Sequence, residues 1–288
     1  MFRFVYHNDR VLPLEDVRLS PGQAGLINGW GVFSTVRVFD GVPFAIERHY
    51  ERLARDAERI QLPLKMTLAQ VREAMLQMLQ ANHARDACVR VYFIFNTIGI
   101  WKSDEKFPPI DLIMYAMDVP ARVGPTKLSV QEHGRYAAHP LTGTKVTSWL
   151  GNAWMVEQAH LRGFDDALLL NEHDEVSECT AANIFCVHGE RVSTPPLDSG
   201  CLAGVSRAIL LEQAPKAGIA IAERPLKLQE VYSADEVFIT STTRHVQPIS
   251  HIEQHAIQRA PGLVTEKLAS LFDHYVKQYL ARATAAVK

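Results

Sequence analysis

The sequence has few cysteines and almost no net charge. Its four cysteines form no CxxC pair or other zinc-binding spacing, and four are too few to crosslink a chain of 288 residues. We therefore expect reduced thiols, no metal site and a cytoplasmic location. The 30 Lys and Arg nearly balance the 32 Asp and Glu. This balance gives no electrostatic reason to expect a nucleic acid or an anionic membrane as a partner.

Long apolar runs and nucleotide-binding glycine motifs are also missing. No stretch approaches the roughly 18 uninterrupted apolar residues of a membrane span, and the first residues, MFRFVYHNDR, contain no apolar signal region. The chain contains neither GxGxxG nor GxxxxGK[ST], which removes the usual support for a dinucleotide or triphosphate ligand. Internal repeats and low-complexity tracts are absent as well.

The composition that remains is typical of a folded protein with two lobes. Hydrophobic residues make up 47% and charged residues 22% of the chain, whose length exceeds the usual size of one domain. Residues 118–126, DVPARVGPT, contain two prolines and a glycine without periodicity, which is typical of a linker. We predict a small N-terminal α/β lobe over residues 1–119, a linker over 120–126 and a larger C-terminal lobe over 127–288.

Hydrophobic periodicity predicts a mixed order of strands and helices. Thr67 and Gln70 form a capping box that opens the second helix. The mixture of strand meanders and helices favours an α+β fold over a regular parallel βαβ array. Strands are expected over 2–6, 31–39, 87–96, 110–117, 127–131, 166–170, 175–179, 183–187 and 235–240, and helices over 46–60, 67–79, 147–161, 205–217 and 263–281. The core-facing residues expected in the third helix are Leu150, Trp154 and Leu161.

Two residues could carry covalent or acid–base chemistry. Lys145, one of ten lysines, lies in a loop of small residues, PLTGTKVTSW, that leads into a helix. Most lysines are solvated surface charges, whereas a buried lysine has a lowered pKa and forms a Schiff base readily. Glu178 lies in a strand between apolar neighbours, where an unpaired carboxylate is costly to bury. A protonated pyridine nitrogen, an arginine or backbone donors would each satisfy it.

Two segments could bind an anion. In CLAGVSR, residues 201–207, Gly204 and Ser206 lie where a loop enters a helix, so backbone N–H groups and a hydroxyl could meet a phosphate. Residues 240–243, TSTT, end a strand with four consecutive hydroxyl side chains. Each segment alone could be an ordinary helix cap or loop. Two such segments so close in sequence favour a ligand that carries a phosphate.

These features, in this order, resemble the class IV, or fold type IV, pyridoxal-phosphate enzymes. That family includes branched-chain aminotransferases, D-amino acid aminotransferases and aminodeoxychorismate lyase. The resemblance covers nearly the whole chain, with Lys145 followed by Glu178 in SE and then by NIF at 183–185. It implies a two-lobed α+β fold, pyridoxal 5'-phosphate as the cofactor, and a homodimer or higher homo-oligomer. The other matching blocks are GVFSTVRV, ERHYERL, TPPLDSGCLAGVSR and DEVFITSTT.

The resemblance also implies roles for individual residues. Lys145 would form the Schiff base with the cofactor and move protons, and Glu178 would pair with the pyridine nitrogen. Thr243 would lie near the substrate carboxylate. Leu150 replaces a tyrosine that often contacts the cofactor phenolate, so that partner stays unassigned. The residues expected to bind the cofactor phosphate are Arg52, Val205, Ser206, Ser241 and Thr242.

Substrate-binding residues are expected mainly on the early strands. A guanidinium group matches a carboxylate bidentately, which makes Arg37, Arg90 and Arg244 candidates for binding the substrate, although a strand arginine can also form a rim ion pair. Phe33 shares a strand face with Arg37. Trp101 lies in a loop long enough to serve as a lid or as a contact to a partner subunit.

The expected reaction is ping-pong transamination between an amino acid, best a branched-chain-type L-amino acid, and a 2-oxo acid. Two alternatives stay open within the family. FSTVR, where branched-chain aminotransferases have FEGIR, and ECTAAN are similar to aminodeoxychorismate lyase, which would release pyruvate and 4-aminobenzoate. TSTT is similar to D-amino acid aminotransferase. A third alternative is a binding protein that keeps the cofactor-binding residues for its structure and catalyses no reaction.

Overall fold

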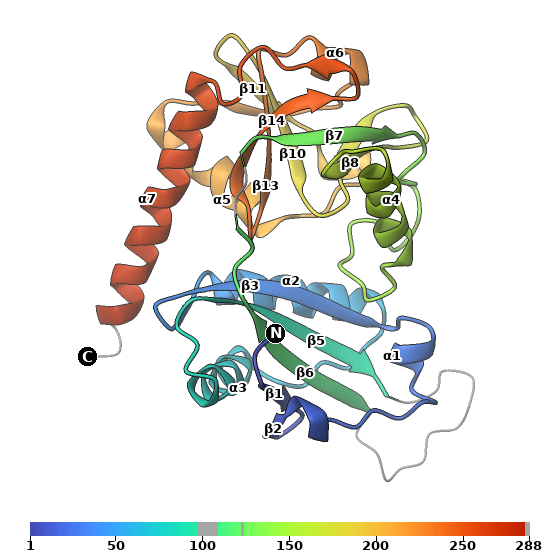
Figure 1. Cartoon of the computed structure of the whole chain (residues 1–288), viewed down its shortest axis with the longest axis vertical. Coiled ribbons are helices and arrows are strands. Elements are labelled where there is room, and N and C mark those ends of the chain that lie inside the picture. Colours follow the sequence, from blue (N-terminus) through green and yellow to red (C-terminus); the bar gives the residue numbers. More distant parts are fainter. Residues whose placement is uncertain (97–108, 122–123, 286–288) are drawn as a thin grey trace. The chain divides into compact units, whose positions relative to one another are not determined.

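The computed structural model describes residues 1–96, 109–121 and 124–285, so Trp101 lies outside the described residues. Its contacts divide the chain into two units (Figure 1). The first comprises Met1–Pro120, Thr144–Trp149 and Tyr279–Lys288, and the second comprises Ala121–Gly143 and Leu150–Gln278. Lys145 therefore groups with the first unit. The reason is that its segment pairs with a strand of the first unit.

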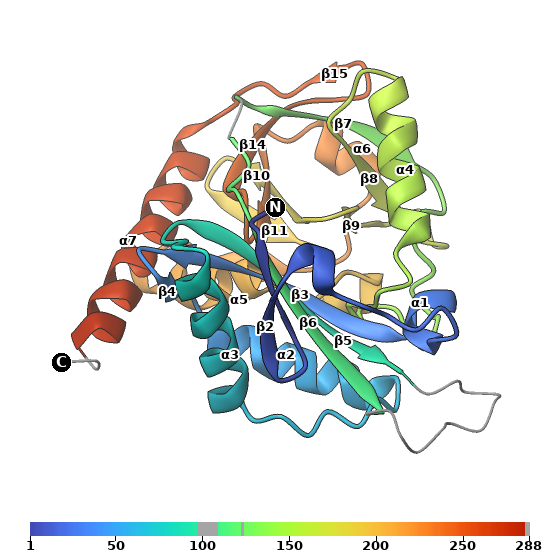
Figure 2. The same cartoon turned by 60° about the horizontal axis from the view of Figure 1, so that its bottom comes forward.

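The first unit is built on a six-stranded antiparallel sheet with strand order β2-β1-β6-β5-β3-β4. The three longest strands, β3, β5 and β6, run side by side in Figure 2. Helices α2 and α3 pack against one face of this sheet. The strands are β1 Phe4–His7, β2 Arg10–Pro13, β3 Gly31–Phe39, β4 Val42–Pro43, β5 Ala87–Phe95 and β6 Ile110–Met117, and the helices are η1 Leu14–Asp16, α1 Ala24–Ile27, α2 Ile46–Arg59 and α3 Leu68–Ala81.

Side-chain alternation gives this sheet two different faces. Along β3, Val32, Val36 and Val38 pack into the core beneath the helices. The intervening residues, among them Phe33, point to the opposite face. The predicted capping box at the start of α3 is confirmed, because the Thr67 side chain accepts from the Gln70 backbone while the Gln70 side chain accepts from the Thr67 backbone. Local sequence signals thus account for the two faces of this sheet and for the start of α3.

The second unit is built on a nine-stranded mixed sheet with order β12-β11-β10-β13-β14-β7-β8-β9, and β15 pairs with β14. The pairs β14–β7, β7–β8 and β11–β12 are parallel. The strands are β7 Thr126–Gln131, β8 Asp166–Leu170, β9 Val176–Cys179, β10 Asn183–His188, β11 Arg191–Thr194, β12 Ile221–Glu223, β13 Glu236–Ser241, β14 His245–Ile252 and β15 His255–Ala256. The helices are α4 Leu150–Leu161, η2 Leu197–Ser199, α5 Val205–Gln213, η3 Pro215–Ala217, α6 Leu228–Tyr232 and α7 Leu263–Ala285, whose residues from Tyr279 onward group with the first unit.

Helix α4 differs from its prediction. It runs along β8 (Figure 2) and begins at Leu150, three residues later than expected. Leu150, Trp154 and Leu161 are 82%, 56% and 80% exposed, so the expectation that they face the core was wrong. Met155 and Ala159 pack against the sheet instead. Apolar spacing identifies an amphipathic helix, but it cannot tell which apolar face meets the chain's own core. None of the helices in the described ranges is long and apolar enough to cross a membrane.

Candidate active site

Lys145 lies in a segment that is fastened to the sheet of the first unit. The Phe33 backbone N–H donates to the Lys145 carbonyl at 3.1 Å, and Val146 forms a β-bridge with Val32. On the other side, the Lys145 backbone N–H donates to Oδ2 of Asp56, a buried residue of α2, at 3.0 Å. Both backbone polar groups of Lys145 therefore have fixed partners, one on β3 and one on α2.

The Lys145 side chain lies against an aromatic face of the sheet. Its Nζ is 4.5 Å from the centroid of the Phe33 ring. Phe33 stacks on Tyr92 with centroids 5.4 Å apart, and Tyr92 stacks on Tyr115 with centroids 5.8 Å apart. The guanidinium of Arg90 lies over Phe33 at 5.4 Å. Cross-strand pairing produces this set, because Phe33 faces Tyr92 and Arg90 faces Tyr115.

Arg90 has spare hydrogen-bonding capacity on this face. Its Nη1 lies 3.5 Å from the Tyr92 hydroxyl, and its buried Nε has no hydrogen-bond partner among the described residues. The hydroxyls of Tyr92 and Tyr115 lie 3.3 Å apart. Burial, together with the Tyr92 hydroxyl, raises the pKa of Tyr115 to about 12. Tyr115 therefore stays a neutral phenol near pH 7, and Arg90 has a buried donor that a carboxylate oxygen can accept.

Arg37, on the same strand face as Phe33, has other partners. Its guanidinium donates to the carbonyl oxygens of Val38 and Ala87, and its Nη2 donates to Asp86 at 3.2 Å. It also lies over the ring of Phe39, 4.1 Å from the centroid. These contacts tie the ends of β3 and β5 together. Several donors of Arg37 therefore contact the backbone and Asp86, and its role as a substrate ligand stays a prediction.

Arg52 is buried beside a serine and a histidine of the first unit. Its Nη2 donates to the Ser34 hydroxyl at 2.9 Å, and that hydroxyl lies 2.8 Å from Nδ1 of His49. Burial lowers the pKa of His49 well below its usual value, and the nearby charges of Arg52 and Lys145 lower it further. The imidazole is therefore neutral, and Nδ1 can accept the Ser34 hydrogen. Ser34 and His49 were not predicted as site residues, although His49 is part of ERHYERL.

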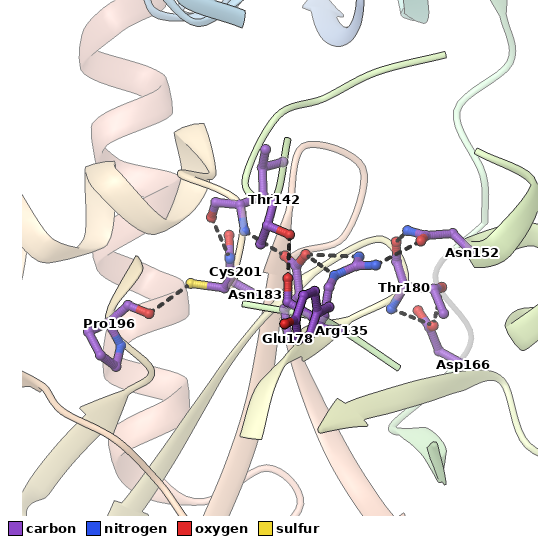
Figure 3. Close-up of polar contacts among 11 residues, drawn as sticks. Arg135, Thr142, Asn152, Asp166, Glu178, Thr180, Asn183, Pro196 and Cys201 are labelled. Carbon is purple, nitrogen blue, oxygen red and sulfur yellow. Dashed lines mark hydrogen bonds and ion pairs between the residues drawn. The ribbon is translucent and has the colours of Figure 1, made fainter. Parts of the chain in front are cut away.

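Glu178 lies in the second unit with an arginine beside it (Figure 3). Arg135 donates through Nε and Nη2 to Oε1 of Glu178, at 3.1 and 3.0 Å. The Leu202 backbone N–H donates to Oε2 at 3.0 Å. The sequence indicated that a buried carboxylate needs a cation or backbone donors, but it could not single out Arg135, which was missed. Oε2 keeps an acceptor position, so the carboxylate can still bind a protonated ring nitrogen.

In the second unit, the start of α5 is the clearest candidate for an anion-binding site. No side chain caps this helix, and Gly204 occupies its N-cap position, followed by the buried residues Val205 and Ser206. A Cβ at Gly204 would lie 2.1 Å from Oδ1 of Asn183, so a larger residue here would displace the Asn183 side chain. Asn183 also pairs with Thr240, whose buried hydroxyl has no partner among the described residues. The uncapped N–H groups and the end of β13 therefore suit a phosphate.

The hydroxyl turn after β13 is the other predicted phosphate segment. The Ser241 and Thr243 hydroxyls lie 3.5 Å apart, and the Arg244 backbone N–H donates to the Ser241 hydroxyl at 3.2 Å. Arg244 Nη1 donates to Asp166 at 2.7 Å. A buried carboxylate of the protein therefore binds one nitrogen of this guanidinium, and the role of Arg244 as a substrate ligand stays a prediction.

The predicted residues thus form one set in each unit. Lys145, Arg52, Phe33 and Arg90 lie in the first unit. The second unit contains Glu178, Val205, Ser206, Ser241, Thr242 and Thr243. The first set contains a lysine amine and two guanidinium groups, and the second contains a carboxylate and hydroxyl groups.

The chain is similar to proteins of known structure and to one known protein family. The chain superimposes on a branched-chain aminotransferase of Thermoproteus uzoniensis, solved with norvaline, with a TM-score of 0.87, 26% identity and 98% of each chain covered. The sequence profile of the family amino-transferase class IV matches residues 31–252. The chain therefore belongs to the class IV aminotransferases, which use pyridoxal 5'-phosphate. Another branched-chain aminotransferase with this fold, 22% identical, was solved with pyridoxamine 5'-phosphate.

Curated relatives carry three different names. A protein of Methanocaldococcus jannaschii, named provisionally as a branched-chain-amino-acid aminotransferase, is 29% identical over 93% of this chain and 94% of its own length. An aminodeoxychorismate lyase of Bacillus subtilis is 26% identical, with 96% of each chain covered. A D-alanine aminotransferase of Staphylococcus epidermidis is also 26% identical, over 96% of this chain and 98% of its own.

Proposed function

We propose that this class IV enzyme transfers the amino group of a branched-chain-type L-amino acid to a 2-oxo acid by a ping-pong mechanism. The observation that carries the proposal is the placement of Lys145, whose backbone is fixed on both sides and whose amine lies on the Phe33 ring. A lysine amine held in one place on a rigid sheet is suited to form a covalent link to an aldehyde.

The proposed cofactor contacts follow from the two sets of residues. Lys145 would form the covalent link, and Glu178 would hold the proton on the ring nitrogen through Oε2. When bound, pyridoxal 5'-phosphate supplies an electron sink for the charge left at the substrate α-carbon. Charge-assisted bonds make these phosphate contacts strong. The residues proposed to bind the phosphate are Arg52, Val205, Ser206, Ser241 and Thr242.

Lys145 and Glu178 would have separate tasks in the reaction. Once the substrate amine has replaced it, the neutral Lys145 amine can remove the α-proton and return a proton during the same half-reaction. Glu178, held by Arg135 and Leu202, keeps its carboxylate in one orientation and stabilises the protonated ring nitrogen. The first task requires movement of the side chain, whereas the second requires rigidity.

Substrate recognition is proposed for the aromatic face next to Lys145. Phe33, Tyr92 and Tyr115 offer apolar surface for a branched aliphatic side chain, while the buried Nε of Arg90 offers a donor for a carboxylate. Thr243 is proposed to lie near a substrate carboxylate as well. The relatives of Methanocaldococcus and Thermoproteus, both named as branched-chain aminotransferases, support this choice.

A half-reaction panel tests the reaction and the substrate together. Each amino donor is added to the cofactor-loaded enzyme without a keto acid, and the absorbance of the bound cofactor is followed until it reaches that of pyridoxamine phosphate. We expect conversion with leucine, isoleucine and valine. Conversion with D-alanine alone would replace the proposal with D-amino acid transamination. No conversion with any of the twenty L-amino acids or D-alanine would exclude transamination.

A lyase is the second candidate, because the Bacillus subtilis relative matches the chain over almost its whole length. Incubation with aminodeoxychorismate and assay of pyruvate and 4-aminobenzoate tests it directly. Release of both products at a rate above that of the transamination half-reaction would favour the lyase, and absence of release excludes it.

The proposal also covers the oligomeric state, the location in the cell and the division into lobes. We propose a cytoplasmic homodimer whose two lobes, 1–119 and 127–288 in chain order, are joined by the linker 120–126. Residues 144–149 and 279–288 pack with the first lobe. The exposed apolar residues of α4, which are Leu150, Trp154 and Leu161, support an interface with a second copy, since large apolar patches on a surface mark such contacts.

A further inference from the structure

Asp166 and Arg244 form an ion pair that none of the proposed cofactor contacts uses. Asp166 is completely buried at the start of β8, and the Arg244 side chain is 30% exposed. Oδ2 of Asp166 accepts from Arg244 Nη1 at 2.7 Å. Oδ1 accepts from the Ala167 N–H at 2.9 Å and from the Thr180 hydroxyl at 2.5 Å (Figure 3). A buried carboxylate needs such partners, because its desolvation is otherwise uncompensated.

This ion pair connects three elements of the second unit. Asp166 opens β8, Thr180 directly follows β9, and Arg244 closes the turn between β13 and β14. Arg244 contacts its own turn as well, because its backbone N–H donates to the Ser241 hydroxyl. Its side chain therefore anchors the hydroxyl turn 241–243 to the buried end of β8.

The hydroxyl turn 241–243 needs a strong contact of this kind to stay in one conformation. Its side chains, Ser241, Thr242 and Thr243, are too short to reach far across the fold, and the Ser241–Thr243 contact at 3.5 Å is at the long limit of a hydrogen bond. A loop held only by weak local bonds samples many conformations, and ordering it costs free energy when a ligand binds. The charge-assisted bond from Arg244 to a buried carboxylate removes much of that cost in advance.

The same anchor continues to the proposed ring-nitrogen acid. The Thr180 carbonyl accepts from Asn152 Nδ2 at 2.6 Å, and Asn152 Oδ1 accepts from Arg135 Nη1 at 2.9 Å. Arg135 in turn holds Glu178 (Figure 3). One continuous chain of polar contacts therefore links the hydroxyl turn to Glu178, all within the second unit.

We propose that the Asp166–Arg244 pair is a positioning device that pre-orders the turn 241–243 for the cofactor phosphate, and that Arg244 is a positioning residue, not a substrate ligand. The inference rests on the proposed function, in which Ser241 and Thr242 bind that phosphate. Arg244 contacts the turn directly, whereas Glu178 is held by Arg135 and the Leu202 N–H. Loss of Arg244 should therefore weaken phosphate binding and leave the binding of the pyridine ring nearly unchanged.

The test compares two ligands that differ only by the phosphate. Apo-enzyme is titrated with pyridoxal 5'-phosphate and with pyridoxal, for wild type and for Arg244→Gln. We expect the affinity for pyridoxal 5'-phosphate to fall roughly tenfold or more, the scale of a hydrogen bond to a charged group, while pyridoxal affinity changes less than about twofold. The control is Arg162→Gln, which breaks the exposed pair with Glu253 in the same unit and should change neither affinity.

Two further variants cover the case in which Arg244→Gln does not fold. Arg244→Lys keeps a cation beside Asp166, and we expect it to retain more of the phosphate-specific affinity. The double variant Asp166→Asn/Arg244→Gln leaves no buried unpaired charge, so it should fold and show the phosphate-specific loss of Arg244→Gln.

Equal losses of affinity for both ligands, or no loss, would overturn the inference. A raised KM for the amino donor with unchanged cofactor affinity would also overturn it, because Arg244 would then bind substrate. If wild type binds neither ligand, the proposed function fails instead.

Discussion

The buried carboxylate of Asp56 holds the backbone of Lys145 in place. Its Oδ2 accepts the Lys145 N–H at 3.0 Å, and its Oδ1 accepts from Nε and Nη2 of Arg55. A hydrogen bond to a charged acceptor is stronger than a neutral one, and burial removes the competition from water. The position of the lysine Cα is therefore set by an acidic side chain on α2 as much as by the pairing with β3.

This relationship predicts an effect of Asp56 on catalysis. Asp56→Ala should lower kcat about 10- to 100-fold, since small displacements of a reacting group have costs of that order. Asp56→Asn keeps an acceptor oxygen and should lose less. We would measure kcat, and by mass spectrometry the fraction of Lys145 linked to cofactor after borohydride reduction. Arg55→Gln is the control, because it breaks the same ion pair without touching Lys145. Unchanged kcat and linkage in Asp56→Ala would contradict the prediction.

The pair of Arg135 and Glu178 predicts a loss of stability. Arg135→Leu should lower the free energy of unfolding by about 3–5 kcal/mol, because it leaves a buried carboxylate without its cation. Denaturant titration of the apo-enzyme measures the change. The matched control is Arg85→Leu, whose pair with Asp40 is 74% exposed on both sides, and a change below about 1 kcal/mol is expected there. Equal changes in the two variants would show that burial of Glu178 carries no such cost.

The lowered pKa of His49 predicts a pH dependence of stability. Below pH 6.5 the unfolded chain binds a proton at this residue while the folded protein does not, so stability falls as pH decreases toward the lowered folded pKa. The slope from this group approaches about 1.4 kcal/mol per pH unit. His49→Gln should remove that slope between pH 6.5 and 5.5. The exposed His274→Gln serves as the control, and identical slopes in wild type and His49→Gln would disprove the assignment.

The free donor of Arg90 predicts a role in substrate binding. Arg90→Gln should reduce kcat/KM for the amino donor roughly 10- to 100-fold, as expected for a lost charge-assisted bond to a carboxylate. Arg37→Gln, on the same sheet face, should change kcat/KM little, because its partners are Asp86 and the backbone. Steady-state kinetics with both variants checks this. A larger effect from Arg37 than from Arg90 would reverse the two assignments.

The exposed apolar face of α4 predicts the assembly. Trp154→Glu should convert the proposed homodimer to a monomer at micromolar concentration, because a charge in an apolar interface is costly to desolvate. Sedimentation velocity measures the change. Leu263→Glu is the control, since Leu263 is an exposed apolar residue elsewhere on the unit, and it should leave the assembly intact. A monomeric wild type would remove the homodimer from the proposal.

Several parts of the fold could be predicted from local patterns. The strand expected over 31–39 is found as Gly31–Phe39, and the helix expected from 46 is found as Ile46–Arg59. The capping box of Thr67 and Gln70 was predicted from two residues and is present. These features depend on neighbours within a few positions in sequence, so periodicity and capping chemistry are sufficient to find them.

Contacts between distant segments could not be predicted in the same way. Arg37, Arg90 and Arg244 look alike in sequence as strand or turn arginines. Of these three, only Arg90 has a buried nitrogen with no partner in the described part of the chain. The other two contact Asp86 and Asp166, which lie 49 and 78 positions away in sequence. Arg135 was missed for the same reason, because its partner Glu178 lies on another element.

The sequence by itself determined the elements, the family resemblance and the residue types of the proposed site, because those depend on order and spacing along the chain. Only the tertiary structure decided which cations were already paired, that Lys145 belongs with the first unit, and that one face of α4 is exposed. The physical reason is that pairing, burial and desolvation are properties of neighbours in space, and the chain brings those neighbours together only when it folds.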